Sequence, residues 1–209
     1  MNIGICGGTF DPFHRGHLEP ILAVRETMQW HRVLYIPALI QPFKQDRATA
    51  SPYHRFAMLT AATLDYDFAY ASTVELERGR VSYSVETLEE LRSAHPDDTL
   101  DWIIGDDNLS QLSEWKSIDR IFELANFAVL TRSNHEVSPP FAARVREPAA
   151  RPTYGAITFA QNPTVPVSST EIRRRVQEGQ PIDELVPPAV SRYIQHYGLY
   201  RKATREQFD

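Results

Sequence analysis

Short apolar runs alternate along this chain with longer segments in which apolar residues recur every three or four positions. A short apolar run bounded by turn residues is typical of a strand buried on both faces, and the longer spacing is typical of an amphipathic helix. The runs predict strands at 2–6, 31–37, 67–76, 100–105, 126–131 and 155–160. The helical spacing predicts a helix after Pro12 that carries Leu18, Ile21, Leu22 and Met28, and further helices near 51–63, 84–94, 117–125, 168–179 and 187–196.

This alternation of strands and helices predicts an α/β fold. Strand–helix–strand units place helices on both faces of a parallel sheet, here an open sheet of about six strands. The whole length, 1–209, is expected to form one domain, with a C-terminal helical part at about 168–201 and a frayed tail at 204–209. The proline-rich segment 133–152 shows neither pattern and is expected to be a loop or an irregular helix.

Local signals mark two of the expected helices. Ser51 precedes Pro52, which predicts a serine cap followed by proline at the first helical position. Ser168 and Glu171 have the spacing of a capping box, in which each side chain bonds the other residue's main-chain N–H. Gly179 is expected to close the helix that begins there.

The composition is that of an ordinary globular protein, with 42% hydrophobic and 23% charged residues. The net charge of −5 provides no basic field for nucleic acid, so any anion site must be local. The single cysteine, Cys6, excludes an intramolecular disulfide. We see no secretory signal and no apolar run of about 20 residues that could span a membrane. A cytoplasmic protein without a membrane partner is therefore expected.

The loop after the first expected strand has the features of a phosphate site. Gly7 and Gly8 lack a Cβ, so an anion can approach the main chain, and the free N–H groups of a helix start favour negative charge. His14 and His17 are three positions apart and share one face of the first helical turn. Two alternatives stay open. The glycines could form a plain turn, and the histidines could bind a metal, although no cysteine or further histidine lies nearby to complete a site.

A second helix start follows the last expected strand. Its free N–H groups, the hydroxyls of Ser168 and Ser169, and Arg173 predict another anion site. The alternative is that Arg173, Arg174 and Arg175 form a solvated helix face, because at most one or two of three consecutive residues can point at one ligand.

Charged and aromatic residues follow other expected strands. Lys44 and Arg55 are expected to be exposed cations, either solvated or in contact with phosphate. Asp106 and Asp107, directly after the fourth strand, could hold Mg²⁺ or cap a helix. Trp115 either belongs to the core or offers a flat face for stacking at a ligand mouth.

Several stretches of the chain resemble known motifs. The segment 7–17, GGTFDPFHRGH, resembles the G-G-T-F-D-P-x-H-x-G-H signature of the nucleotidyltransferase superfamily with a HIGH-type nucleotide site. Three later stretches resemble its nicotinate-nucleotide adenylyltransferase family: 82–84 (SYS, where the family has S-Y-T), 105–115 (G-x-D-x…W) and 167–173 (VSSTEIR, where the family has I-S-S-T-x-I-R). Gly198-Leu199-Tyr200 resembles the usual ending of this family, and the resemblance extends over 1–201.

The resemblance implies a Rossmann-like nucleotidyltransferase fold and a reaction. AMP would pass from ATP to nicotinate mononucleotide, giving nicotinate adenine dinucleotide and pyrophosphate in NAD synthesis. Mg²⁺ would accompany ATP, with no metal held by the protein alone. The partners would be these small molecules, and the chain would be a monomer or a small homo-oligomer. No covalent intermediate is expected, because the attacking group is already an ionised phosphate oxygen.

The resemblance also implies the residues of the site. Those expected to bind ATP are Gly7, Gly8, Thr9, Phe10, His14, His17, Gly105, Asp107, Ser168, Ser169 and Arg173. Those expected to bind the mononucleotide are Thr9, Lys44, Tyr83, Ser84, Asp107 and Trp115. The chemistry is expected to depend on His14, His17, Lys44 and Arg173. The family has P-H-K where this chain has Pro42-Phe43-Lys44, so Phe43 removes one donor from the expected phosphate site.

Two other functions are compatible with parts of this pattern. One is another adenylyl- or cytidylyltransferase, such as a pantetheine-phosphate adenylyltransferase, although that family lacks the stretch 105–115. The other is a nucleotide-binding regulatory module without turnover, against which the complete set of His14, His17 and Arg173 argues. Selectivity between nicotinate and nicotinamide mononucleotides does not follow from the sequence.

Overall fold

The fold is built around a six-stranded, fully parallel sheet with the strand order β3-β2-β1-β4-β5-β6. The computed structural model describes residues 1–40, 50–131 and 137–202. The strands are β1 (Asn2–Gly8), β2 (Arg32–Pro37), β3 (Ala69–Ala71), β4 (Thr99–Gly105), β5 (Asn126–Leu130) and β6 (Ile157–Ala160). This confirms the predicted open parallel sheet and its number of strands.

Successive side chains of each central strand enter two different cores, because the side chains of a strand alternate between the faces of the sheet. On β1, Ile3 and Ile5 join one core, and on β4, Leu100 and Trp102 join the same one. Ile103 belongs to the other core. Both faces are apolar, which explains why the central strands are nearly continuous apolar runs in the sequence.

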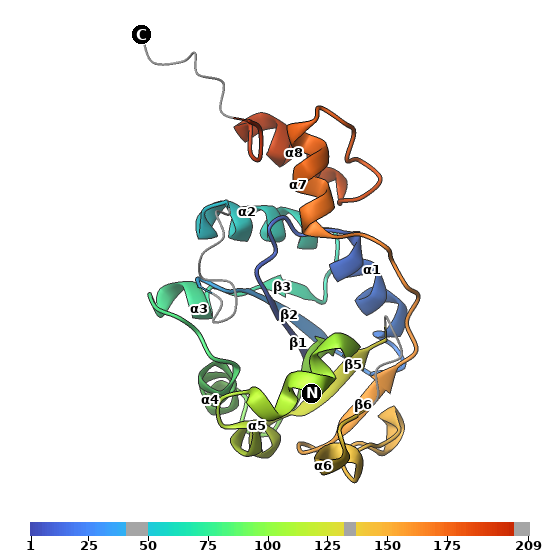
Figure 1. Cartoon of the computed structure of the whole chain (residues 1–209). Coiled ribbons are helices and arrows are strands. Elements are labelled where there is room, and N and C mark those ends of the chain that lie inside the picture. The colour runs from blue at the N-terminus through green and yellow to red at the C-terminus, as the bar shows by residue number, and fades with distance from the viewer. Residues whose placement is uncertain (41–49, 132–136, 203–209) are drawn as a thin grey trace.

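Helices cover both faces (Figure 1). The helices are α1 (Arg15–Val24), α2 (Pro52–Thr63), α3 (Val74–Glu77), α4 (Ser84–Ala94), α5 (Ile118–Leu124), α6 (Pro139–Ala142), α7 (Ser169–Gln177) and α8 (Pro188–Tyr197), with 3₁₀ segments η1 (Asp106–Glu114) and η2 (Pro148–Ala150). The first core takes residues from α1, α2, α7 and α8. The second takes residues from α4, η1, α5 and α6.

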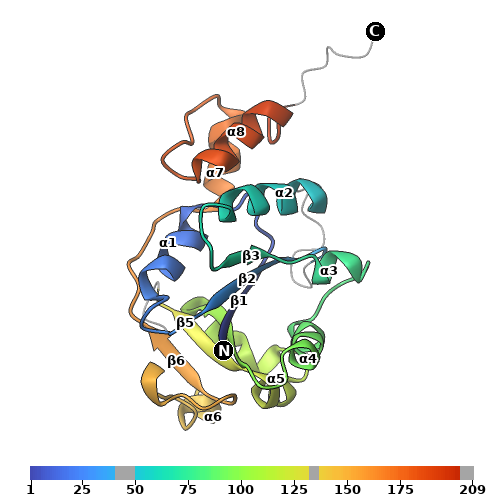
Figure 2. The same cartoon turned by 180° about the vertical axis from the view of Figure 1, so that it is seen from behind.

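The C-terminal helices α7 and α8 extend the first core beyond the sheet, above α1 and α2 in Figure 1 and again in the reverse view of Figure 2. Ile172, Val190 and Ile194 are buried with Leu18 and Met58. Gly179 follows α7 with a φ of +71°, the left-handed conformation in which glycine ends a helix without strain. The prediction that Gly179 closes this helix is confirmed.

Two predictions in the first half of the chain differ from the structure. The predicted strand 67–76 is wrong in its second half, because β3 ends at Ala71 and Val74–Glu77 forms the short helix α3. Met28 lies beyond the end of α1 in a turn, although its side chain is fully buried. Tertiary burial thus explains an apolar position that periodicity assigned to the helix.

The proline-rich region 133–152 is irregular where the structure describes it. It contains only the short α6 and η2 besides loop, as its pattern predicted. Residues 132–136 and the predicted tail 204–209 lie outside the described residues. None of the described helices is long and apolar enough to cross a bilayer.

Candidate active site

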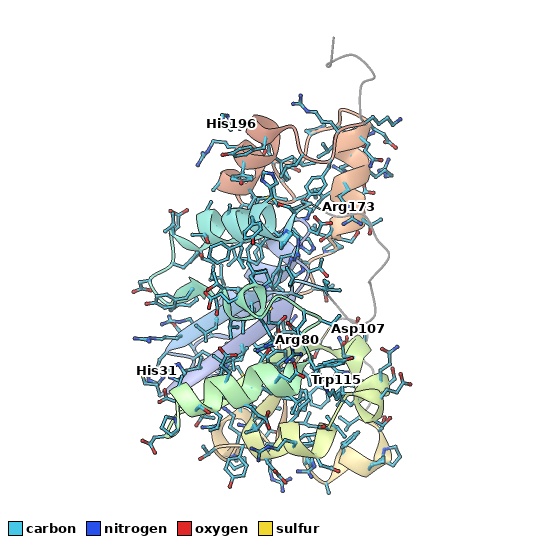
Figure 3. All side chains as sticks on the ribbon, turned by 90° about the vertical axis from the view of Figure 1, so that its left-hand side faces the viewer. His31, Arg80, Asp107, Trp115, Arg173 and His196 are labelled. Carbon is cyan, nitrogen blue, oxygen red and sulfur yellow. The ribbon has the colours of Figure 1, made fainter. Side chains whose placement is uncertain are left out.

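The expected site residues gather where the carboxyl ends of the strands meet. In the observed order, β2 and β3 extend the sheet on one side of β1, and β4, β5 and β6 extend it on the other side. The order of the strands therefore reverses between β1 and β4, and ligands of open parallel sheets bind at such a switch point. The loop after β1 carries His14, and the segment after β4 begins at Asp106. In Figure 3, Arg173, Asp107 and Trp115 lie toward the same edge of the molecule, and His31, which precedes β2, lies at the opposite edge.

Two histidine rings stack at the start of α1. The ring centroids of His14 and His17 are 3.7 Å apart with an interplanar angle of 23°, and the main-chain N–H of His14 donates to Nδ1 of His17 at 3.3 Å. His17 also stacks on Phe13. His14 is 4% exposed, whereas His17 is half-buried. The pair therefore forms a rigid imidazole layer with one edge accessible from the site.

The residues before the pair shape the loop by packing. A Cβ on Gly7 would lie 3.0 Å from the Trp102 ring, and one on Gly8 would lie 3.0 Å from the Phe10 ring. Phe10 itself is buried, with a φ of +51°, and its ring meets His17 edge to face. The expected contact of Phe10 with ATP is therefore limited to its main chain, because its ring belongs to the core.

Arg173 on α7 is joined to the same loop. Its Nη1 donates to the main-chain oxygen of Asp11 at 2.6 Å and lies 3.5 Å from the Asp11 carboxylate. Next to it, Ser169 Oγ donates to the main-chain oxygen of Pro12 at 3.0 Å. The two predicted anion sites are thus brought together through Asp11 and Pro12, although 162 positions separate Asp11 from Arg173 along the chain.

The remaining cations of α7 serve the helix itself. Arg174 and Arg175 both bond the Glu171 carboxylate, and these bonds lower the Glu171 pKa to about 2. Ser168 Oγ accepts from the Glu171 N–H at 3.2 Å and so caps the helix. The predicted capping box is wrong in its second half, because the Glu171 carboxylate bonds the two arginines instead of the Ser168 N–H.

Arg55 was expected to be exposed, and that prediction is wrong: it is 2% exposed. Its guanidinium donates to the main-chain oxygens of Thr9 at 2.5 Å, Ala38 at 2.7 Å and Ala50 at 3.3 Å. Burial lowers the pKa of Arg55, and the Asp11 carboxylate opposes this shift. Arg55 therefore organises three loop segments at the sheet edge. No periodic pattern distinguishes such an arginine from a surface cation.

The start of α4 forms a second polar region of the site. Tyr83 is the residue before the helix and Ser84 is its first residue, but neither side chain caps it. Lys116 Nζ lies 4.1 Å above the Tyr83 ring and 3.1 Å from the Glu86 carboxylate. Both Tyr83 and Ser84 are half-buried, and their main-chain N–H groups lie at a helix N-terminus.

The residues after β4 divide between core and surface. Gly105 precedes η1, Asp106 is fully buried, and Asp107 is exposed and accepts from Asn108 Nδ2 at 3.3 Å. Neither aspartate caps η1, since its cap residue is Gly105, which corrects the capping alternative. Trp115 is half-buried and meets Phe127 edge to face at 5.7 Å, so part of its surface stays accessible.

A hollow of about 420 Å³ lies beside the α7 start. It is lined by Gly16 and Pro20 of α1, by the loop 162–168 and by Glu171. A Cβ on Gly16 would come within 3.3 Å of the Val167 main-chain oxygen, so glycine lets this loop lie close to α1. Volumes of this size are typical of small-molecule sites, which span roughly 300–1,000 Å³.

Some predicted residues are not tested by this geometry. Lys44 and Phe43 lie outside the described residues. Thr9 Oγ1 is buried and has no hydrogen-bond partner among the residues that the structure describes. Within the same described residues, no group of three or more His, Cys, Asp or Glu side chains could hold a metal ion.

Asp11 and Tyr200 at this edge were not among the expected site residues, and Arg55 was expected only as an exposed cation. Asp11 bonds Arg173, Tyr200 and the Ala50 N–H, and Arg55 supports its neighbours. Asp11 stands in the signature 7–17, Tyr200 in the family ending 198–200, and Arg55 near a strand end. None of these signals indicates the contacts that the three residues make, because their partners lie far away in the sequence.

A switch-point site with a stacked histidine pair, two helix starts and a converging arginine defines a nucleotidyltransferase of the α/β class. The family model of cytidylyltransferase-like proteins matches residues 5–175. A probable nicotinate-nucleotide adenylyltransferase of Roseiflexus sp. is 39% identical and covers 95% of this chain and 98% of the relative. A probable nicotinate-nucleotide adenylyltransferase of Thermoanaerobacter sp. is 36% identical, and the match covers 97% of this chain and 95% of the relative. The chain belongs to the nicotinate-nucleotide adenylyltransferase family.

The fold agrees with solved structures. Plasmodium falciparum nicotinic acid mononucleotide adenylyltransferase complexed with NaAD superposes with a TM-score of 0.72 at 18% identity, covering 95% of this chain and 97% of that one. The same enzyme complexed with APC superposes with a TM-score of 0.70 at 16% identity, covering 95% and 96%. At these identities the likeness concerns the fold alone.

Proposed function

We propose that this protein transfers AMP from ATP to nicotinate mononucleotide, with nicotinate adenine dinucleotide and pyrophosphate as products. One observation carries the proposal: the histidine pair of α1 and Arg173 of α7 are joined through the loop 11–12 at the switch point of the sheet. Imidazole and guanidinium groups beside helix N-termini are the donors that a triphosphate needs. The family membership supports the same reaction.

The protein's contribution is positioning and charge stabilisation. The attacking group is a phosphate oxygen that is already ionised near neutral pH, so no strong general base is required. His14, His17 and Arg173 would stabilise the charge that develops on the α-phosphate and on the leaving pyrophosphate. Lys44 remains part of this proposal as a further phosphate contact. Rigid stacking of the two imidazoles favours this role, since preorganised donors need not reorganise during the reaction.

The two substrates would occupy different parts of the edge. The hollow between α1 and the loop 162–168 fits the nucleoside part of ATP, with Ser168, Ser169 and Gly8 near the phosphates. The mononucleotide would lie toward the α4 start, where Tyr83 and Ser84 offer main-chain donors to a carboxylate. Trp115 would stack on the pyridine ring, and Asp107 would hold ribose hydroxyls between the two.

Mg²⁺ would enter with ATP. Among the described residues, no group of three or more His, Cys, Asp or Glu side chains is placed to hold it. Mg²⁺ characteristically keeps several waters and takes substrate phosphates as ligands, which fits delivery as the ATP complex. The protein's own groups would then bind phosphate oxygens that the ion leaves uncoordinated.

Pyrophosphate release from Mg·ATP tests the reaction. We expect release to require nicotinate mononucleotide and to be much slower with nicotinamide mononucleotide. Release with pantetheine phosphate instead would assign the chain to another reaction of the superfamily. ATP binding without release with any acceptor would favour a regulatory nucleotide-binding module. The cytoplasmic location and the monomeric or small homo-oligomeric state stay predictions.

A further inference from the structure

We propose that Tyr200, beyond the end of α8, is a positioning residue that sets the orientation of Arg173 through the Asp11 carboxylate. The proposal rests on the role of Arg173 in the proposed function. Tyr200 Oη donates to Asp11 Oδ1 at 2.7 Å, across 189 positions of sequence. The other carboxylate oxygen, Oδ2, faces Arg173 Nη1 at 3.5 Å. A single carboxylate therefore links the C-terminal turn to the arginine.

The Asp11 side chain is buried, and both of its carboxylate oxygens face hydrogen-bond donors. It is 2% exposed, and its Oδ1 accepts from the Ala50 N–H at 3.0 Å as well as from Tyr200. With Oδ1 held by two donors, Oδ2 is aimed at Arg173. The guanidinium is fixed in turn, because Nη1 bonds the Asp11 main chain and Nη2 bonds Thr170 Oγ1 at 3.2 Å.

Tyr200 is well suited to be a permanent donor in this chain of bonds. Burial and the neighbouring Asp11 carboxylate both raise the pKa of its phenol, so the hydroxyl keeps its proton. Its φ of +64° lies in the left-handed region, which bulky side chains rarely adopt. Backbone strain of this kind persists when the surroundings over-determine the conformation, and it is common at functional sites.

The structural consequence is that the C-terminal turn completes the arginine site. Without the Tyr200 hydroxyl, the Asp11 carboxylate would keep one donor at Oδ1 and could rotate. Arg173 would keep its bonds to the Asp11 main-chain oxygen and to Thr170 but lose the carboxylate that faces Nη1, so its guanidinium would meet the triphosphate over a wider range of orientations. Loss of preorganisation weakens ATP binding or turnover without changing the contacts of the mononucleotide.

The test is Tyr200→Phe, which removes only the hydroxyl. We expect kcat/KM for ATP to fall about tenfold, near the lower end of what one hydrogen bond to a charged group contributes. The KM for nicotinate mononucleotide should stay unchanged. The matched control is Tyr193→Phe on α8, which removes a hydroxyl that bonds His54 at 3.0 Å and not the site, and it should leave kcat/KM unaltered.

A double-mutant cycle separates positioning from a general structural role. In an Arg173→Ala background, Tyr200→Phe should cause no further loss, because the residue through which it acts is gone. Additive losses, or a single variant as active as wild type, would overturn the proposal. If Arg173→Ala itself kept full activity, the role of Arg173 in the proposed function would be the claim that fails.

A second variant keeps the proposal testable if Tyr200→Phe does not fold. Asp11→Asn keeps the shape of the side chain but removes the negative charge that faces Arg173. It should reproduce the selective loss in kcat/KM for ATP and should also add nothing in the Arg173→Ala background. An Asp11→Asn protein with normal ATP kinetics would contradict the proposal even if Tyr200→Phe failed to fold.

Discussion

Side chains that are proposed to bind ATP at this site also pack against one another. His17 stacks on His14 and on Phe13, and Phe10 closes the layer edge to face. The glycines before them are required where Trp102 and Phe10 come close. The signature 7–17 therefore contains, besides the proposed ligand contacts, the residues of a small aromatic cluster that fixes the two imidazole rings.

Replacing His17 tests its proposed role in charge stabilisation. We expect His17→Ala to lower kcat by about 10²–10³, the usual effect of removing one preorganised donor. The fold should persist, because His17 is half-buried and its neighbours belong to a larger core. Steady-state kinetics and circular dichroism measure both. His31→Ala is the matched control, since His31 is exposed at the opposite edge, and an undiminished kcat in His17→Ala would remove His17 from the mechanism.

Replacing Trp115 tests stacking on the pyridine ring. We expect Trp115→Ala to raise the KM for nicotinate mononucleotide by about three- to tenfold, the range of an aromatic pair. The KM for ATP should not change, because the Trp115 side chain is proposed to contact the mononucleotide alone. Trp115→Phe keeps a flat face and should restore most of the affinity. Equal effects on both substrates would argue for a packing role alone.

Among the elements, α7 shows how one helix combines stability with site geometry. Its first turn is capped by Ser168 and tied to Pro12 through Ser169, while Glu171 holds two arginines away from the site. Arg173 is the one cation of that run bonded to Asp11 among the described contacts. Sequence spacing predicted that at most one or two of the three arginines could point at one ligand, and the contacts of α7 leave Arg173 as the candidate.

The Glu171 network predicts a pH-dependent contribution to stability. Bonds from Arg174 and Arg175 lower the Glu171 pKa to about 2, below its unfolded value. A carboxylate with a lowered folded pKa stabilises the native state above its unfolded pKa of about 4.3, and this contribution is lost as the pH falls toward the folded value. The free energy of unfolding of wild type should therefore exceed that of Glu171→Gln at neutral pH.

Urea titrations of both proteins at several pH values measure this difference. The gap between wild type and Glu171→Gln should narrow steadily below about pH 4 as the carboxylate protonates. Because Glu171 lies at the protein surface, high salt should also reduce the gap. A gap that grows on acidification would show that the ion pairs do not stabilise α7.

For the molecule as a whole, the two edges of the sheet where the strands begin and end differ in role. The proposed site lies at the carboxyl ends of the strands, and a buried polar cluster joins their amino ends. Asp101 at the start of β4 accepts from Trp30 Nε1 at 2.7 Å, Asn126 Nδ2 at 3.0 Å and Arg151 Nε at 3.1 Å. Both Asp101 and Arg151 are almost fully buried, and burial raises the Asp101 pKa despite the guanidinium beside it.

Removing the charge of Asp101 should therefore affect stability and spare the site. We expect Asp101→Asn to lower the free energy of unfolding by about 3–5 kcal/mol, since it leaves the Arg151 guanidinium buried without its partner. Urea unfolding measures this loss. Arg120→Ala, which breaks exposed ion pairs, is the control and should change stability by less than about 0.5 kcal/mol. A large drop in the kcat of folded Asp101→Asn would contradict the claim that this cluster stabilises the fold without affecting the site.

The extent to which the fold could be predicted depends on how local the signal was. Largely apolar runs marked β1, β2, β4 and β5 correctly, because strands buried on both faces leave few polar positions. The run that became β3 and α3 was misread, since its edge position lets a short strand turn into a helix within a few residues. Met28 was assigned to α1 because burial outside a helix imitates helical periodicity.

The sequence by itself determined the strand–loop–helix units, the motif resemblances and hence the family, because these depend on neighbouring residues and on short spacings. Only the tertiary structure decided that Arg55 is an internal brace, that Arg173 rather than Arg174 meets Asp11, and that Tyr200 returns to the first loop. The physical reason is that a hydrogen bond requires direction and proximity between groups, and for residues more than a hundred positions apart these exist only once the chain has packed.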